Sequence, residues 1–284
     1  MFCAERGFDP LCVPIDTVLH FLTTLFNQGL GHSAINTARS ALSAVLQPMG
    51  GKTVGSHPKI VRFMKGVFEL RTPLPRHNNF WDVSILLKHL ENQEDGELGL
   101  KDLTLKLCAL MLLTSAQRLQ TIHLIKASNI LWHNSECTIL LTDKLKSTHP
   151  GFDQKEIKFH KFQKNPKLCV IKCLKEYLER TEPLRRKHCD QLFLCYRPPH
   201  GAASKDTLAR WMKSLLYKVG IQDFGPHSFR GASSSAMAKS GVPIDDILKS
   251  AGWSSAQTFQ KFYNKPIGKK PVDNNSILNY YKKI

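Results

Sequence analysis

The sequence predicts a mostly α-helical protein with a small antiparallel β-sheet, divided into two domains. Apolar residues recur every three or four positions along much of the 284 residues, which is the pattern of helices that bury one side. Only two short runs, residues 138–142 and 156–159, have the β-branched and aliphatic composition of strands. A polar segment with two prolines, residues 71–79, is expected to be the linker between the domains.

The N-terminal domain, residues 1–70, is predicted to consist of helices only. The first helix covers residues 15–26 and is ended by the glycines that follow it. Ser33 is a candidate N-cap for the second helix, and Pro58 opens the third, which extends to residue 69. The basic residues of this domain that we expect on its surface are Arg39, Lys52, Lys59, Arg62 and Lys65.

The larger domain, residues 80–284, is predicted to be mixed. Residues 100–113 are apolar nearly all round, which indicates a central buried helix. The two strand-like runs are joined by a long loop and predict an antiparallel hairpin. Further helices are expected at 168–180, at 205–219 with Ser204 as its cap, at 228–239, after Pro243, after Ser254 or Ser255, and at 276–282.

The charge of the chain indicates a polyanionic partner. Lys and Arg number 40 against 23 Asp and Glu, which gives a formal net charge of +17. No run approaches the roughly 20 apolar residues that span a bilayer, and residues 1–10 lack the pattern of a signal peptide. The eight cysteines include no C-x2-C pair, so no zinc site is expected. These observations favour an intracellular nucleic-acid-binding protein without a membrane partner.

Two features of the larger domain place cations beside its predicted core. Arg118 follows the central helix, where its side chain would leave the core and point into a cleft. Lys144 and Lys146 lie in the loop of the hairpin, from which a lysine can reach a phosphate or a leaving oxygen. Taken singly, each of these residues is more simply a solvated surface charge.

Two further features lie toward the C-terminus. His227 and Arg230 are three residues apart on a predicted helix, so they share one side and can both donate to one anion. Trp253 lies 23 residues after Arg230, and Tyr263 lies 10 residues after Trp253. Taken singly, Trp253 is a core aromatic and Tyr263 a half-buried helix residue.

As an ordered set, these residues resemble the active site of the tyrosine recombinases, the phage-integrase family. The resemblance covers most of the chain and implies a helical core-binding (SAM-like) DNA-binding domain, residues 1–70, followed by a mixed α+β catalytic domain. Three stretches are similar to the recombinases of DIRS-type and Ngaro-type retrotransposons of eukaryotes: LTSAQRLQTIHL, HPKIVRFMKGVF, and the run from HSFRGASSS to KFYNK. This closer similarity implies a transposable-element origin and a nuclear location.

The resemblance implies a site-specific DNA recombinase or integrase that needs no metal, ATP or other cofactor. The implied catalytic residues are Arg118, Lys146, His227, Arg230, Trp253 and the nucleophile Tyr263. The tyrosine would form a 3′-phosphotyrosyl bond, the arginines and the tryptophan would stabilise the transition state, and the histidine would transfer a proton. The hairpin lysine would be the general acid, with Lys144, also a candidate DNA-binding residue, as the alternative.

The implied partner is duplex DNA, bound by a homotetramer, with no small-molecule substrate. Two positions depart from the family pattern: Thr121 stands where many members have an acidic residue, and Phe262 stands at the commonest spacing of the nucleophile. Two alternatives stay open from the sequence, a non-catalytic DNA-binding remnant of a mobile element and a type IB topoisomerase-like enzyme.

Overall fold

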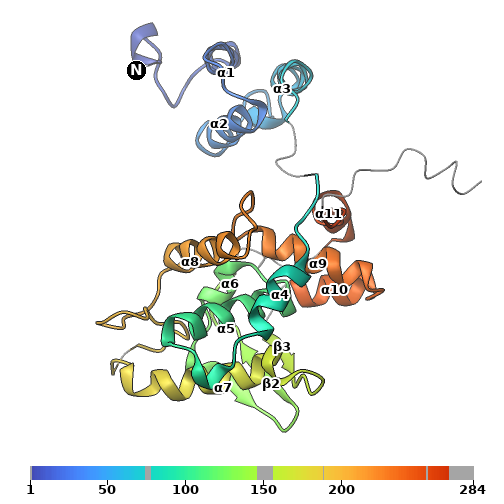
Figure 1. Ribbon diagram of the computed structural model, residues 1–284. Coiled ribbons are helices and arrows are strands. Elements are labelled where there is room, and N and C mark those ends of the chain that lie inside the picture. Colours follow the sequence, from blue (N-terminus) through green and yellow to red (C-terminus); the bar gives the residue numbers. More distant parts are fainter. Residues whose placement is uncertain (1, 74–77, 146–155, 188, 254, 269–284) are drawn as a thin grey trace, which may run out of the picture. The chain divides into compact units, whose positions relative to one another are not determined.

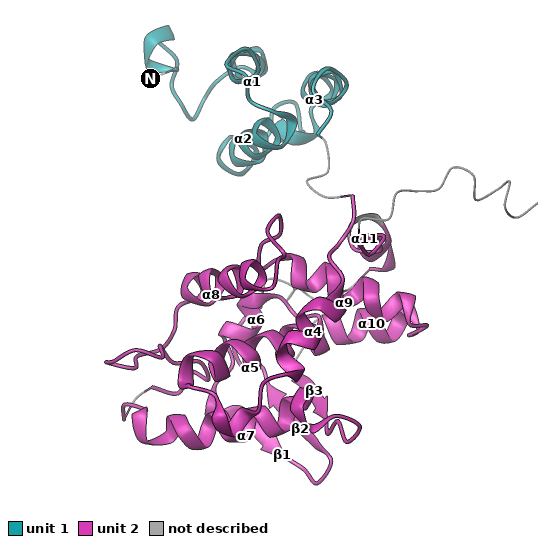
Figure 2. Cartoon of the chain, in the orientation of Figure 1, with its two compact units in different colours: residues 1–76 teal, residues 77–284 magenta. Residues whose placement is uncertain are grey.

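The chain divides into two compact units, residues 1–76 and residues 77–284 (Figures 1 and 2). The computed structural model describes residues 2–73, 78–145, 156–187, 189–253 and 255–268. Each unit has its own hydrophobic core. Within these ranges no helix combines the length and the apolar character needed to cross a membrane.

Unit 1 is built from three α-helices, α1 (Ile15–Asn27), α2 (His32–Val45) and α3 (Pro58–Leu70). Their inner sides meet at fully buried residues such as Leu22, Ile35 and Ile60. The prediction that Ser33 caps α2 was wrong. The backbone of Gly31 is the extended residue before the helix, so Ser33 already lies in the first turn.

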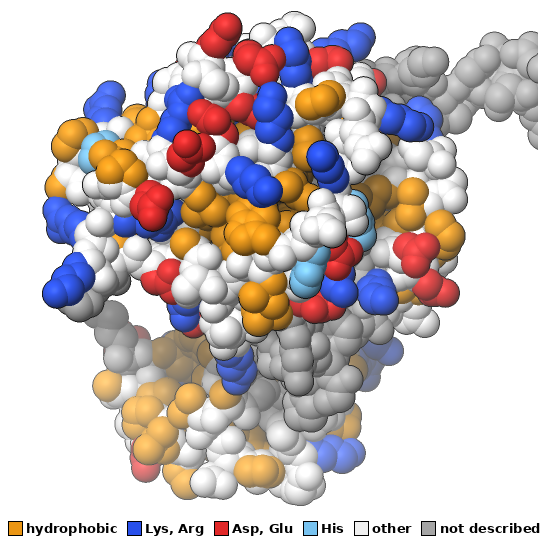
Figure 3. All heavy atoms as spheres, turned by 90° about the horizontal axis from the view of Figure 1, so that it is seen from below, with side chains coloured by type: hydrophobic (Ala, Val, Ile, Leu, Met, Phe, Trp, Pro, Cys, Tyr) orange, Lys and Arg blue, Asp and Glu red, His pale blue; other side chains and the backbone are white. Residues whose placement is uncertain are grey.

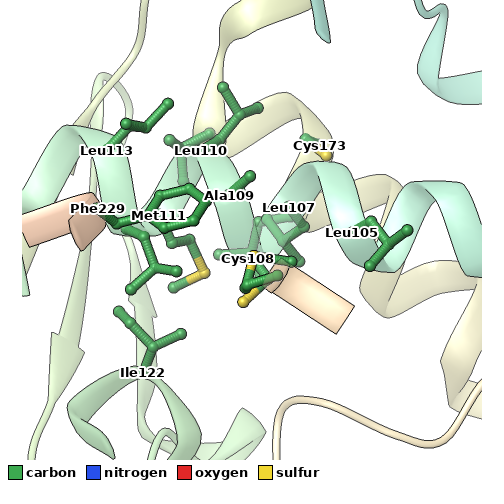
Figure 4. Close-up of a cluster of buried hydrophobic side chains, with 14 of the residues drawn as sticks. Leu105, Leu107, Cys108, Ala109, Leu110, Met111, Leu113, Ile122, Cys173 and Phe229 are labelled. Atoms are coloured by element: carbon green, nitrogen blue, oxygen red, sulfur yellow. The ribbon is translucent and has the colours of Figure 1, made fainter. Parts of the chain in front are cut away.

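Unit 2 is organised around α5 (Leu100–Ser115), which is buried nearly all round as its sequence predicts. Helices α7 (Val170–Thr181), α8 (Lys205–Lys218) and α9 (Ser228–Lys239) pack against it. Figure 4 shows Phe229 of α9 and Ile122 of α6 (Leu119–His123) beside Met111 of α5. The central helix therefore connects the elements that carry the candidate site.

The sheet of unit 2 is antiparallel and has the order β1-β2-β3. Strands β2 (Glu136–Leu140) and β3 (Glu156–His160) form the predicted hairpin, with Cys137 opposite Phe159. The edge strand β1 (Ile130–Trp132) was not predicted, because three residues are too few for a recognisable alternation. The expected mostly helical fold with a small antiparallel sheet is confirmed.

The C-terminal helices begin and end close to the residues that the sequence predicts, but the Ser255 side chain, which precedes α11, makes no capping hydrogen bond within the described residues, and Ser254 lies outside them. The Ser204 side chain accepts from the Thr207 N–H and caps α8. Helix α10 (Ile244–Ala251) ends at Gly252, whose φ of 66° is in the left-handed region that favours glycine, and α11 (Ala256–Phe262) follows. Helix α4 (Val83–Glu91), capped by Asp82, was missed. The predicted helix at 276–282 lies outside the described residues.

A buried ion pair ties α5 to the short 3-10 helix Asp95–Glu97. Lys106, in the middle of the apolar helix, is fully buried with its Nζ 2.8 Å from a carboxylate oxygen of Asp95. Arg180 of α7 donates to the carbonyl groups of the same turn. A cation that interrupts the apolar pattern of α5 is thus neutralised inside the core.

Candidate active site

The start of α9 is fixed by its packing, and this sets the position of His227 and Arg230. Residues Ser228–Ser235 are all buried. The indole N–H of Trp81 donates to the Ser228 hydroxyl at 2.8 Å, and the Trp81 ring packs edge-on against Phe229. His227 is the residue that precedes the helix, and Arg230 lies in its first turn.

Arg230 is the most unusual side chain of the site, because only 1% of it is exposed. One guanidinium nitrogen, Nη1, donates to the carbonyl oxygens of Ala116 and Ala251 at 2.9 and 2.5 Å. Its Nε and Nη2 atoms are buried and have no hydrogen-bond partner within the described residues. In the same part of the chain no carboxylate forms an ion pair with Arg230 or with Arg118.

The electrostatics of Arg230 favour a bound anion. Burial, and then the charge of Arg118, lower the pKa of Arg230, while Tyr263 opposes this shift. An arginine stays protonated at neutral pH, so Arg230 is a buried cation without a counter-charge in the part of the chain that the structure describes. A phosphate could supply both the charge and the acceptors that Nε and Nη2 lack.

Two aromatic rings form one wall of the site. The Trp253 ring lies under Arg230, with 3.9 Å between its centroid and the guanidinium carbon, and its indole N–H is buried without a partner among the described groups. The Tyr263 ring lies 4.7 Å from that of Trp253. The left-handed turn at Gly252 allows the backbone N–H of Trp253 to donate to the Leu248 carbonyl at 2.9 Å. This bond positions the Trp253 indole beside Arg230.

The Tyr263 hydroxyl lies beside a group that can accept its proton. The distance between this oxygen and His227 Nε2 is 3.3 Å. Tyr263 follows the last residue of α11, and its own N–H donates to Phe259 at 2.8 Å. A hydroxyl and an imidazole at this distance are the components of an activated oxygen nucleophile.

Arg118 reaches the same site from α6. Ala116 has a φ of 51°, in the left-handed region, so the chain turns sharply after α5 and continues extended at Arg118. Arg118, His227 and Arg230 line a cavity of about 340 Å³. Lys205, at the start of α8, also lines it. Sequence reasoning missed Lys205, because only the packing of α6 against α8 brings this residue to the cavity.

The structure thus brings five predicted residues together and leaves the lysine undecided. Lys146 lies outside the described residues, and Lys144 is exposed in the segment after β2. Thr121 is buried in α6, where its N–H donates to the Arg118 carbonyl at 2.9 Å. Phe262 is the last residue of α11, and its side chain is also outside the described part.

The predicted basic residues of unit 1 differ in their surroundings. Lys52 and Arg62 are exposed, and Lys59 is exposed but 2.5 Å from a carboxylate oxygen of Asp16. Arg39 is half-buried and donates to the Gly55 carbonyl at 2.9 Å.

On the face in Figure 3, Lys and Arg side chains are mixed with acidic ones around a central hydrophobic group, so this face is not uniformly basic.

The sequence matches a known protein family over most of unit 2. Residues 82–267, more than half of the chain, match the family described as "Phage integrase family". No match is found among the curated proteins.

Solved structures with the same fold include three protein–DNA complexes. The Tn1549 transposon integrase with transposon right end DNA has a TM-score of 0.61 at 11% identity, over 96% of this chain and 85% of that one. The XerH site-specific recombinase bound to its difH substrate has a TM-score of 0.57 at 15% identity, over 88% and 67%. A lambda integrase tetramer on a Holliday junction has a TM-score of 0.54 at 13% identity, over 96% and 71%. At these identities the similarity concerns the fold.

Proposed function

Because the chain belongs to the phage integrase family, we propose that it cleaves and rejoins DNA through a covalent bond between Tyr263 and a 3′ phosphate. One observation carries the proposal. The Tyr263 hydroxyl lies 3.3 Å from His227, and the Tyr263 ring centroid lies 5.8 Å from the guanidinium carbon of Arg230, a buried cation whose Nε and Nη2 have no hydrogen-bond partner among the described residues and suit a phosphate. Nucleophile, proton acceptor and anion site are thus adjacent in one chain.

The proposed reaction exchanges one ester bond for another. The Tyr263 oxygen attacks the phosphorus, its proton passes to His227, and the bond from phosphorus to the 5′ oxygen breaks. The departing oxygen takes a proton from a general acid and leaves as a 5′-hydroxyl. A 5′-hydroxyl of another strand then reverses the steps, so the phosphotyrosine conserves the bond and no ATP is consumed.

The arginines act on the phosphate itself. Negative charge grows on the non-bridging oxygens as the phosphorus is attacked, and fixed donors in a buried site stabilise it most effectively. Arg230 and Arg118 would hold these oxygens, and the indole N–H of Trp253 would donate to one of them. For the general acid we retain Lys146, with Lys144 as the alternative.

The proposed substrate is duplex DNA, bound by a tetramer. The net charge of +17 supports a contact with a phosphate backbone, and the basic residues of unit 1 and Lys144 are candidates for it. The three similar structures are complexes with DNA, one of them a tetramer. The LTSAQRLQTIHL and HSFRG segments support an origin in a DIRS-like or Ngaro-like element and a nuclear site of action.

A covalent-trapping experiment tests the proposal. The full chain is incubated with a library of nicked duplexes of random sequence, with EDTA and without ATP, and protein–DNA adducts are separated under denaturing conditions. Wild type and Tyr217→Phe, a change at a tyrosine of α8 that is 66% exposed and outside the site, should form adducts. Tyr263→Phe should form none.

Other outcomes select the alternatives. DNA binding without an adduct on any duplex would contradict the proposal and indicate a non-catalytic remnant. Relaxation of supercoiled plasmid without recombination would indicate a type IB topoisomerase-like activity.

A further inference from the structure

We propose that Ser235 is a positioning residue for the nucleophile, acting through the backbone of Tyr263. The Ser235 hydroxyl donates to the Tyr263 carbonyl and accepts from the Lys265 N–H at 3.3 Å, and the same N–H also donates to the Tyr263 carbonyl at 3.1 Å. Ser235 is 3% exposed, so water does not replace these contacts readily. The inference rests on the proposed function, since it concerns how the attacking tyrosine is held.

Ser235 and the phosphate-binding side chains belong to one rigid helix. His227 precedes α9, Arg230 lies in its first turn, and Ser235 lies in its buried middle. A helix that packs on α5 along this length does not bend easily. The bond from Ser235 therefore fixes the main chain of Tyr263 relative to the groups that would hold the phosphate.

The position of Tyr263 in its own helix explains why it needs this contact. Tyr263 follows the end of α11, where its carbonyl accepts no N–H from a following helical turn and receives instead the N–H of Lys265, two residues on, at 3.1 Å. Ser235 supplies a hydroxyl donor from a different helix at this point. Without it, the main chain of Tyr263 would lose its hydrogen bond to α9.

A second attachment lies a few residues further along the chain. Phe80 exchanges two backbone hydrogen bonds with this segment, donating to Pro266 at 2.9 Å and accepting from Gly268 at 2.8 Å. The Asn79 side chain also donates to Gly268, at 2.8 Å. This attachment fixes the path of the chain after Tyr263, while Ser235 fixes the tyrosine itself, so loss of the Ser235 hydroxyl should displace Tyr263 without releasing the segment.

The test compares two buried serines of α9. Ser235→Ala removes the contact with Tyr263. Ser234→Ala removes a similarly buried hydroxyl whose acceptors, within the described residues, are the Arg230 and Gly231 carbonyls of its own helix. With saturating DNA, adduct formation by Ser235→Ala should be about 10- to 100-fold slower than by Ser234→Ala, the range expected for a misplaced reacting group. The Kd for DNA should be the same for both variants.

A second measurement reports on the position without any reaction. In the free protein, exchange of the Lys265 amide, followed by NMR, should be faster in Ser235→Ala than in wild type or in Ser234→Ala, because this N–H loses one of its two acceptors and the Tyr263 carbonyl that remains is no longer held by Ser235. Ser235→Thr, which keeps the hydroxyl, should restore both slow exchange and adduct formation. Melting temperatures of all variants show which proteins are folded. The comparison of Ser235→Ala with Ser234→Ala then shows whether the Ser235 hydroxyl positions Tyr263.

The outcomes separate this inference from the proposed function. If wild type forms no adduct on any duplex, the proposed function fails, and amide exchange alone decides whether Ser235 holds this segment. Equal adduct rates in the two alanine variants, or an unchanged Lys265 exchange rate in Ser235→Ala, would overturn the positioning role.

Discussion

Replacing Gly231 with alanine should displace Phe80 from the surface of α9. A Cβ atom at position 231 would lie 2.0, 2.3 and 2.6 Å from three carbons of the Phe80 ring. Ordinary contact begins at 3.4 Å, so the nearest atom must move by about 1.4 Å to reach it. The ring cannot simply rotate away, because Phe80 is buried and both its N–H and its carbonyl are hydrogen-bonded to the backbone of residues 266–268.

Two opposing effects set the expected magnitude. Overpacking a close contact costs about 1–3 kcal/mol, and the three short distances place this contact at the upper end. Alanine in place of glycine inside a helix stabilises the folded state by up to about 1 kcal/mol. The free energy of unfolding of Gly231→Ala should therefore be about 2 kcal/mol lower than that of wild type.

Urea denaturation with a double-mutant cycle checks this reasoning. In a Phe80→Ala background the ring is absent, so Gly231→Ala should become neutral or stabilising by up to about 1 kcal/mol. Gly66→Ala is the matched control, because Gly66 also lies inside a helix and an added Cβ there meets no atom within 4 Å. The explanation is refuted if Gly231→Ala destabilises both backgrounds equally.

The remaining predictions concern charge. Asp95→Asn should lower the free energy of unfolding by about 3–5 kcal/mol, since Lys106 keeps its bond to the Gln93 carbonyl but loses the carboxylate that neutralises it in the core. Asp102→Asn, in an exposed pair, should cost less than about 1 kcal/mol; urea denaturation measures both, and equal losses would contradict the assignment. At constant ionic strength, phosphate should raise the melting temperature of wild type more than that of Arg230→Gln, and equal rises would argue against an anion site at Arg230. Asp82 caps α4 through an N–H bond that lowers the pKa of its carboxyl, so its stabilisation is present above about pH 4 and is lost as the pH falls below that value. Asp82→Ala should cost about 1 kcal/mol at pH 7, and the difference from wild type, followed by thermal melts, should shrink toward pH 2.

Elements with strong local signals could be predicted from the sequence. Helix α5 is apolar all round, Ser204 caps α8, and Gly252 ends α10. Helix α4 was missed although Asp82 offers an N-cap, because its nine residues follow a linker-like segment. The strand β1 is stabilised by pairing with β2 rather than by its own three residues.

The residues of the candidate site could be predicted from the sequence, but their burial and their hydrogen-bond partners could not. The spacing of His227 and Arg230 indicated a shared side of a helix, and the structure places both at one cavity. The burial of Arg230 depends on carbonyl groups supplied by Ala116 and Ala251, which are distant in the sequence. The contact from Ser235 to Tyr263 also joins residues that are distant in the sequence, so no local pattern predicts it.

Identifying the DNA-linked residue tests the central claim most directly. Wild-type protein trapped on DNA is digested with nuclease and protease, and the peptide that carries a nucleotide is sequenced by mass spectrometry. The proposed chemistry predicts one modified residue, Tyr263, with the nucleotide attached through its 3′ phosphate. A nucleotide on any other residue, or an adduct that persists in Tyr263→Phe, would contradict it.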